Sequence, residues 1–152
     1  MDDFEKVVGA SSVVTDLGGG DAESIVTALV DALVADGGLP ASRRDEAIGV
    51  VLARERLGST AIADGVALPH GYLDGLAGAA MAVGVHRDGI GFGAADGQPV
   101  HLFVLLLNST QAVAGHIKFL AQLSRRLLQP SVLAAVRAAR TSAGVRLALC
   151  PA

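Results

Sequence analysis

The sequence predicts an α/β fold in which helices cover both faces of a central sheet. Apolar residues recur at helical spacing in the first and last thirds of the chain, while extended segments and glycine-containing turns fill the middle. Residues 100–108 (VHLFVLLLN) form the most apolar of these extended segments. Because a strand that is apolar on both sides must be buried on both faces, we expect helices on both sides of the sheet.

Two helices are expected in the first third of the chain. Apolar residues follow helical spacing over 25–34, and Asp21 can serve as the N-cap of that helix. A second helix is expected over about 42–57. Ser42 and Asp45 have the spacing of a capping box at its start, with Asp in place of the usual Glu or Gln.

The middle of the chain reads as strands and turns. Residues 60–71 are expected to form two short extended segments around the turn signal Asp64-Gly65. Residues 79–87 are expected to form a strand, and 89–99 a glycine-rich loop with at most one short strand. The next segment is the apolar strand already described.

Helices are expected again after that strand. A third helix is predicted over about 112–128, followed by one or two further helices over 131–139 and 142–149. The apolar residues of the third helix that we expect to face inward are Ile117, Leu120, Leu123, Leu127 and Leu128.

Composition excludes several classes of function. The 152 residues carry a net charge of −3 and no basic stripe, so nucleic acid is not an expected ligand. Cys150 is the only cysteine, which excludes an internal disulfide and a cysteine-based zinc site. With no signal peptide and no apolar run of membrane-spanning length, we expect a cytoplasmic protein whose residues 1–152 form one domain.

The histidines are the main candidates for chemistry. No two of His70, His86, His101 and His116 lie three to five residues apart, so no local metal-binding pair exists and no metal is expected. His86 and His101 are expected to be structural or surface residues. His70 follows Pro69 in the stretch GVALPHG (65–71). This stretch is either an ordinary turn or a way of holding an imidazole at a strand end, and the residues alone leave both open.

Phosphoryl transfer is a reaction that such a histidine could carry out. A neutral imidazole is a good nucleophile near pH 7, and the group that it accepts needs donors for its oxygens. Arg54, Ser59, Thr60 and His116 could supply these donors, although sequence alone does not bring them together. The usual sequence signatures of hydrolases and nucleotide-binding proteins are missing.

Residues 53–71 (ARERLGSTAIADGVALPHG) resemble a known active-site signature. It is that of the enzyme IIA domains of the bacterial phosphoenolpyruvate-dependent sugar phosphotransferase system, of the fructose, mannitol and nitrogen-regulatory type. Residues 88–107 and 115–127 resemble the loop with the central strand and the helix with the second histidine of that family. The resemblance implies a mixed sheet of about five strands with helices on both faces, as in phosphotransferase/anion transport proteins.

The resemblance also implies roles for individual residues. His70 would be the phosphorylated residue, His116 the second active-site histidine and Arg54 the arginine that helps to hold the phosphate. Ser59 and Thr60 would line the same pocket. No cofactor is implied.

Protein partners follow from the same resemblance. The phosphocarrier protein HPr, or its nitrogen-branch paralogue, would supply the phosphoryl group, and a cysteine of a sugar-specific IIB domain would receive it. The protein would be peripheral to a membrane transporter at most, and a monomer or weak homodimer. Apolar docking surfaces are expected around His70, with Tyr72, Leu73 and Leu76 as candidates for the rim.

Two alternatives remain beside a sugar-uptake carrier. The protein could be a regulatory module whose phosphorylation at His70 changes its binding to a protein partner, with no sugar moved. It could also be a non-catalytic relative, as the cytoplasmic part of anion exchangers is, but the presence of His70, His116 and Arg54 argues against this. Tyr72 stands where fructose-type and regulatory members often have a basic residue, which blurs the subfamily.

Overall fold

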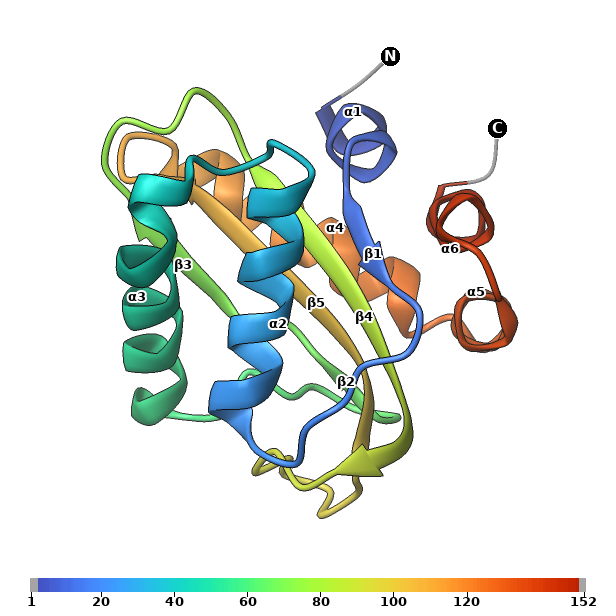
Figure 1. Cartoon of the computed structure of the whole chain (residues 1–152). Coiled ribbons are helices and arrows are strands. Elements are labelled where there is room, and N and C mark those ends of the chain that lie inside the picture. Colours follow the sequence, from blue (N-terminus) through green and yellow to red (C-terminus); the bar gives the residue numbers. More distant parts are fainter. Residues whose placement is uncertain (1–2, 151–152) are drawn as a thin grey trace.

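The computed structural model describes residues 3–150, which form one mixed sheet between two layers of helices (Figure 1). The helices are α1 (Asp3–Gly9), α2 (Ala22–Ala35), the 3₁₀ turn η1 (Ala41–Arg43), α3 (Arg44–Leu57), α4 (Val113–Leu127), α5 (Pro130–Ala138) and α6 (Ser142–Leu149). The strands are β1 (Ser12–Val14), β2 (Val66–Ala67), β3 (His70–Leu73), β4 (Ala80–Ile90) and β5 (Val100–Ser109). Both the fold class and the expected strand number are confirmed.

The sheet is built around β5. Its order is β1-β4-β5-β2, and β3 pairs with β5 on the same side as β2. Strand β4 is antiparallel to β5, whereas β2 and β3 are parallel to it and β1 is parallel to β4. The chain therefore places β1 at one edge of the sheet, and β2 followed by β3 at the other.

Each face of the sheet has its own apolar core. Helices α2 and α3 cover one face, and α1, α4, α5 and α6 cover the other (Figure 1). Alternate residues of β5 belong to the two cores: Phe103, Leu105 and Leu107 to the first, and Leu102, Val104 and Leu106 to the second. All six side chains are fully buried, so the predicted burial of this strand on both faces is confirmed.

Of the two helix starts predicted in the first third of the chain, one is confirmed and one is wrong. Asp21 caps α2 as expected, since its carboxylate accepts a hydrogen bond from the Ser24 N–H at 2.9 Å. The capping box predicted at Ser42 is wrong. The chain enters α3 through the 3₁₀ turn after Pro40, so Ser42 lies inside that turn and Arg43 occupies the N-cap position without a side-chain cap.

The inward face of α4 also differs from the prediction. Ile117 and Leu128 are 60% and 41% exposed, whereas His116 and Phe119 are buried along with Leu123 and Leu127. These four buried residues follow the spacing i, i+3, i+7, i+11 of one helix face. Leu123 and Leu127 were predicted correctly and Leu120 packs half-buried against the second core, but a histidine opens the stripe where Ile117 was expected.

The segment before His70 explains how the edge of the sheet is formed. Asp64 and Gly65 both have positive φ angles, 58° and 78°, which confirms the predicted turn. Strands β2 and β3 are two pieces of one edge, interrupted at Pro69, which has no N–H to donate to the ladder. His70 is therefore the first residue of β3 rather than a residue beyond a strand end.

Helix α1 was not predicted from the sequence. Helix α1 packs onto the second core through Phe4 and Val8, and the Phe4 ring lies 5.2 Å from that of Phe119.

Within residues 3–150, no helix combines the length and the apolar character needed to cross a membrane.

Candidate active site

Two histidines from distant parts of the chain lie side by side at the β3 edge. Successive residues of a strand point to opposite faces, so His70 and Tyr72 face the α4 side of the sheet. Helix α4 places His116 against both of them. The ring centroids are 5.2 Å apart for His70 and His116, and 4.7 Å apart for Tyr72 and His116.

The local backbone determines which nitrogen of His70 is available. Its Nδ1 lies 2.8 Å from the carbonyl oxygen of Leu68. Because a carbonyl only accepts hydrogen bonds, this contact assigns the proton to Nδ1. Nε2 then carries the lone pair, on a side chain that is only half-buried. The site therefore presents Nε2 as its nucleophilic atom.

His116 is held in a dry and unpolarised environment. The residue is fully buried, and neither ring nitrogen has a hydrogen-bond partner within residues 3–150. Burial, with a smaller contribution from His70, lowers the pKa of His116 to about 4. The ring is therefore neutral at physiological pH, and its one N–H and one lone pair are both unused.

Helix α3 approaches the same edge strand from the other face. A Cβ on Gly71 would lie 2.8 Å from the Val50 Cγ2 atom, so α3 packs directly on the β3 backbone. Arg54 follows Val50 by about one helical turn. Its guanidinium donates from Nη1 to the Gly58 carbonyl at 2.7 Å, and Nε and Nη2 have no partner among the described residues.

Ser59 and Thr60 hydrogen-bond within the protein. The Ser59 hydroxyl donates to the Phe92 carbonyl at 2.5 Å, and the Thr60 hydroxyl donates to Glu55 at 2.6 Å. Glu55 also accepts the Thr60 N–H at 3.0 Å. The Thr60 carbonyl in turn accepts the Leu68 N–H at 3.1 Å. These bonds tie the end of α3 to the segment that leads into His70.

Glu55 was not among the site residues predicted from the sequence. It anchors Thr60 through both oxygens and thus holds the loop between α3 and β2. The sequence does contain this acid, since the segment 53–71 that resembles the family signature has Glu55 before Ser59 and Thr60. However, the spacing of these residues does not say that the acid bonds the threonine.

The other two histidines lie apart from this pair. His86 donates from Nε2 to the Gly19 carbonyl at 2.8 Å and accepts the Gly89 N–H on Nδ1 at 3.0 Å. The Nδ1 of His101 lies 3.1 Å from the His86 carbonyl oxygen. Both rings thus have backbone partners, as their expected structural role requires.

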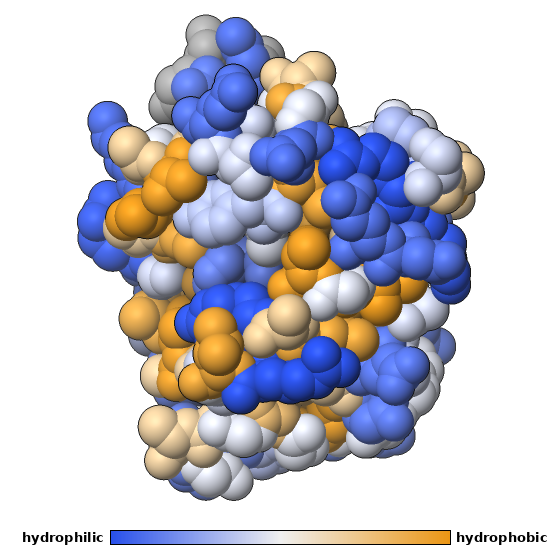
Figure 2. Space-filling model, turned by 90° about the vertical axis from the view of Figure 1, so that its left-hand side faces the viewer, coloured by the Kyte–Doolittle hydropathy of each residue, from blue (hydrophilic) through white to orange (hydrophobic). Residues whose placement is uncertain are grey.

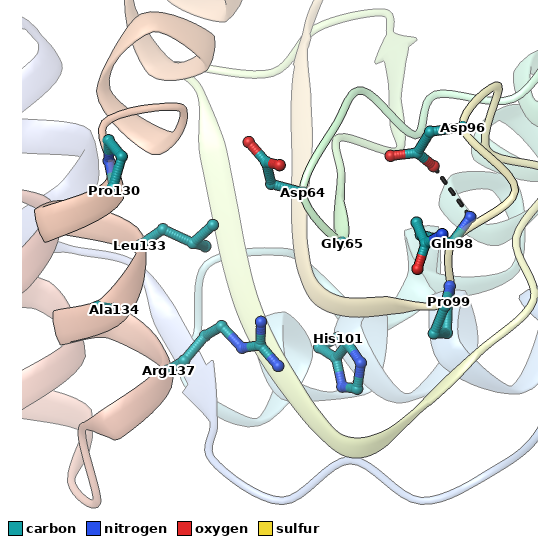
Figure 3. Close-up of a pocket in the computed structure, with 10 residues that line it drawn as sticks. All are labelled: Asp64, Gly65, Asp96, Gln98, Pro99, His101, Pro130, Leu133, Ala134 and Arg137. Atoms are coloured by element: carbon teal, nitrogen blue, oxygen red, sulfur yellow. Dashed lines mark hydrogen bonds between the residues drawn. The ribbon is translucent and has the colours of Figure 1, made fainter.

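A cavity of about 530 Å³ lies near the start of β5 (Figure 3). The Arg137 side chain extends from α5 toward His101, and Asp64 faces the space between Leu133 and the loop before β5. His70 pairs with Leu106, five residues farther along β5 than His101, which corresponds to about 16 Å along the strand. The cavity is therefore separate from the histidine pair. Across residues 3–150, no cluster of three acidic, histidine or cysteine residues could hold a metal ion.

A protein-family comparison covers most of the chain. Residues 6–149 match the family described as "Phosphoenolpyruvate-dependent sugar phosphotransferase system, EIIA 2". A nitrogen regulatory protein of Bradyrhizobium diazoefficiens is 41% identical over 105 residues, or 68% of this chain and 69% of that one. The fructose-specific EIIABC component of Bacillus subtilis is 33% identical over 82 residues, which is 54% of this chain but 13% of that protein.

Solved structures agree with the family match. The nitrogen regulatory protein IIA-Ntr of Neisseria meningitidis superimposes with a TM-score of 0.85 at 28% identity, covering 97% of this chain and 99% of that one. The mannitol IIA of Escherichia coli shares the fold, with a TM-score of 0.75 at 21% identity over 93% and 97% of the two chains. With its sheet, its paired histidines and a family match over nearly its full length, the chain belongs to the EIIA type 2 family of the phosphoenolpyruvate-dependent sugar phosphotransferase system.

Proposed function

We propose that the protein is a phosphoryl carrier that accepts the group on Nε2 of His70 and passes it to a second protein. One observation carries the proposal most directly. The Leu68 carbonyl holds the proton on Nδ1, which leaves the Nε2 lone pair free beside a buried, neutral His116. A nucleophile with a fixed tautomer and a nearby unused donor is what a phosphohistidine site requires.

The transfer step can be written with this geometry. The Nε2 lone pair of His70 attacks the phosphorus of a phosphohistidine on the donor protein. The donor N–P bond breaks, its electron pair stays on the donor imidazole, and a new N–P bond forms at His70. The phosphorylated ring keeps its proton on Nδ1, where the Leu68 carbonyl stabilises the positive charge. Because the leaving group in the next step is then a neutral imidazole, the phosphoryl group stays transferable.

We propose three sets of donors for the oxygens of the transferred group. The N–H of His116 has no partner of its own, and the Nε and Nη2 groups of Arg54 have none within residues 3–150. Helix α4 begins without a side-chain cap, which leaves its first-turn N–H groups as further donors beside His116. Ser59 and Thr60 are better suited to positioning the loop than to binding phosphate, because their hydroxyls donate elsewhere.

Docking of the donor and acceptor proteins would use the surface around His70. Of the rim residues predicted from sequence, Leu73 is a core residue, while Tyr72 and Leu76 are half-buried. Val113 and Ile117, on either side of His116 in α4, are 43% and 60% exposed. Figure 2 shows the side of the molecule on which α3 and β3 lie, where apolar residues are interspersed with hydrophilic ones. Such a mixed surface suits transient protein contacts.

Phosphorylation of variants tests the proposal. The protein is incubated with phosphoenolpyruvate and the two general phosphotransferase proteins, and its intact mass is measured. We expect an acid-labile gain of one phosphate that is lost in His70→Ala and retained in His101→Gln, a control histidine outside the site. Absence of the gain in the unsubstituted protein, or its persistence in His70→Ala, would contradict the proposal.

A regulatory role is the second candidate. The relative that is 41% identical over 68% of this chain, and the structure with a TM-score of 0.85, are both nitrogen regulatory proteins. In that case the chemistry at His70 is the same, but no IIB cysteine receives the group. Phosphorylated protein mixed with candidate IIB domains decides between the two: transfer to a cysteine supports the sugar-uptake role, and its absence across the IIB domains of the same cell supports the regulatory one.

A further inference from the structure

We propose that Tyr72 is a positioning residue, whose ring encloses His116 and fixes the orientation in which that imidazole meets a phosphoryl group on His70. The proposal rests on the phosphoryl-carrier function proposed above. It adds Tyr72 to the site, a residue to which the sequence motif assigns no role.

The position of Tyr72 follows from the strand. It lies two residues after His70 in β3, so both side chains project from the same face, about 7 Å apart along the strand. His116 contacts both rings, with interplanar angles of 52° to His70 and 57° to Tyr72. Within residues 3–150, the titratable side chains whose rings contact His116 are those of His70 and Tyr72, and both come from β3.

The exposure of the neighbouring residues identifies Tyr72 as a cover. His116 is fully buried although it lies in the first turn of α4, where Val113 and Ile117 are both exposed. Tyr72 is half-buried, so the residue lies between solvent and the imidazole that its ring contacts. Replacing this ring with a methyl group would open His116 to water.

Packing, rather than hydrogen bonding, fixes the orientation of the His116 ring. A buried imidazole is usually held by a partner on one nitrogen, which fixes both its rotation and its tautomer. His116 has no partner on either nitrogen within residues 3–150, so the rings of His70 and Tyr72 are left to restrict its rotation.

The enclosure also determines what His116 can offer to a phosphoryl group. A dry imidazole in the first turn of a helix stays neutral, because both desolvation and the positive end of the helix dipole oppose its protonation. A neutral ring donates one hydrogen bond to the phosphoryl oxygens. An opened site would instead admit water to the phosphoryl group, which would shorten the lifetime of the carrier state.

The test compares Tyr72→Phe, which keeps the ring, with Tyr72→Ala, which removes it, and Tyr72→Leu as a variant that retains most of the volume. The first measurement is the pH titration of the His116 ring by NMR in the unphosphorylated proteins. We expect Tyr72→Phe to titrate like the unsubstituted protein, Tyr72→Ala to titrate at least about one pH unit higher, toward the value of a solvated imidazole, and Tyr72→Leu to titrate between the two. An unchanged titration in a folded Tyr72→Ala overturns the proposal, and so does a larger shift in Tyr72→Leu than in Tyr72→Ala.

The second measurement is the lifetime of the phosphorylated form. Loss of phosphate to water should be about tenfold faster in Tyr72→Ala than in the unsubstituted protein, and unchanged in Tyr72→Phe. Equal lifetimes in all variants overturn the proposal, and so does a short lifetime in Tyr72→Phe, which would assign the effect to the hydroxyl instead. If the unsubstituted protein accepts no phosphate, the carrier function itself fails, and the NMR titration still reports separately whether Tyr72 encloses His116.

Discussion

At the scale of single residues, His116 makes stability depend on pH. Its pKa lies at about 4 in the folded protein because the ring is buried, whereas an unfolded chain leaves the pKa of a histidine near 6.5. As pH falls below 6.5, the unfolded state binds a proton that the folded state does not. The free energy of unfolding should therefore decrease between about pH 6.5 and pH 4, by at most about 3 kcal/mol from this residue.

Denaturant unfolding of His116→Gln checks this expectation. Glutamine is similar in size but does not titrate, so the variant should lose less stability than the unsubstituted protein as the pH falls from 7 to 4.5. Carboxylates titrate in both proteins, and the difference between the two curves isolates His116. Parallel curves would show that His116 titrates alike in the folded and unfolded states.

The sequence pointed to His70 and His116 but not to how the two rings are used. The chemical types, the motif before His70 and the second histidine in a later helix were all visible in the chain. The tautomer of His70 was not visible, because it depends on the contact between Nδ1 and the Leu68 carbonyl oxygen in the folded chain. The contact of Tyr72 with His116 was also hidden, because it forms only when α4 packs against β3.

At the scale of secondary-structure elements, the close packing of α3 on β3 depends on Gly71. A Cβ there would lie 2.8 Å from Val50 Cγ2 and 3.4 Å from the Val50 carbonyl carbon, so either the Val50 side chain or the helix would have to move. A glycine beside a reactive histidine can also admit a partner or a phosphate close to the backbone. The structure assigns that close approach to α3 instead.

Gly71→Ala should accordingly destabilise the protein by about 1 to 3 kcal/mol, as overpacking of a core contact does. Gly78→Ala is a matched control, since a Cβ at Gly78 meets nothing within 4 Å and its φ is not positive. The control should stay within about 0.5 kcal/mol of the unsubstituted protein. Urea unfolding measures both variants, and a Gly71→Ala protein as stable as the control would mean that α3 can shift without cost.

Prediction of the elements succeeded where apolar periodicity was continuous and failed where a polar residue joined the pattern. The central strand and the helices on both sides of it were expected because their apolar residues repeat regularly. Only the start of the inward face of α4 was misassigned, at Ile117, because the preceding histidine opens the buried stripe. The sequence could not show that the segments before and after Pro69 form one edge of the sheet, since their pairing with β5 is a long-range property.

At the scale of the whole molecule, the sheet order separates the core from the reactive edge. Strand β5 is buried between two helical layers, whereas β3 pairs with β5 alone and lies at one edge of the sheet. Strand β1, beside which α6 packs, lies at the opposite edge. This arrangement gives the His70 site a rigid support on one side and access for a second protein on the other.

The exposed residue Ile117 tests where that second protein docks. It follows His116 in α4 and is 60% exposed, so Ile117→Glu places a charge on the proposed docking surface without filling the core. We expect the KM for the phosphorylated donor protein to rise about tenfold, as loss of an interface contact does, with kcat nearly unchanged. Leu147→Glu is the matched control, because Leu147 is 58% exposed on α6, near the opposite edge of the sheet. Steady-state phosphorylation with increasing donor protein measures both variants, and equal KM values would place the docking surface away from α4.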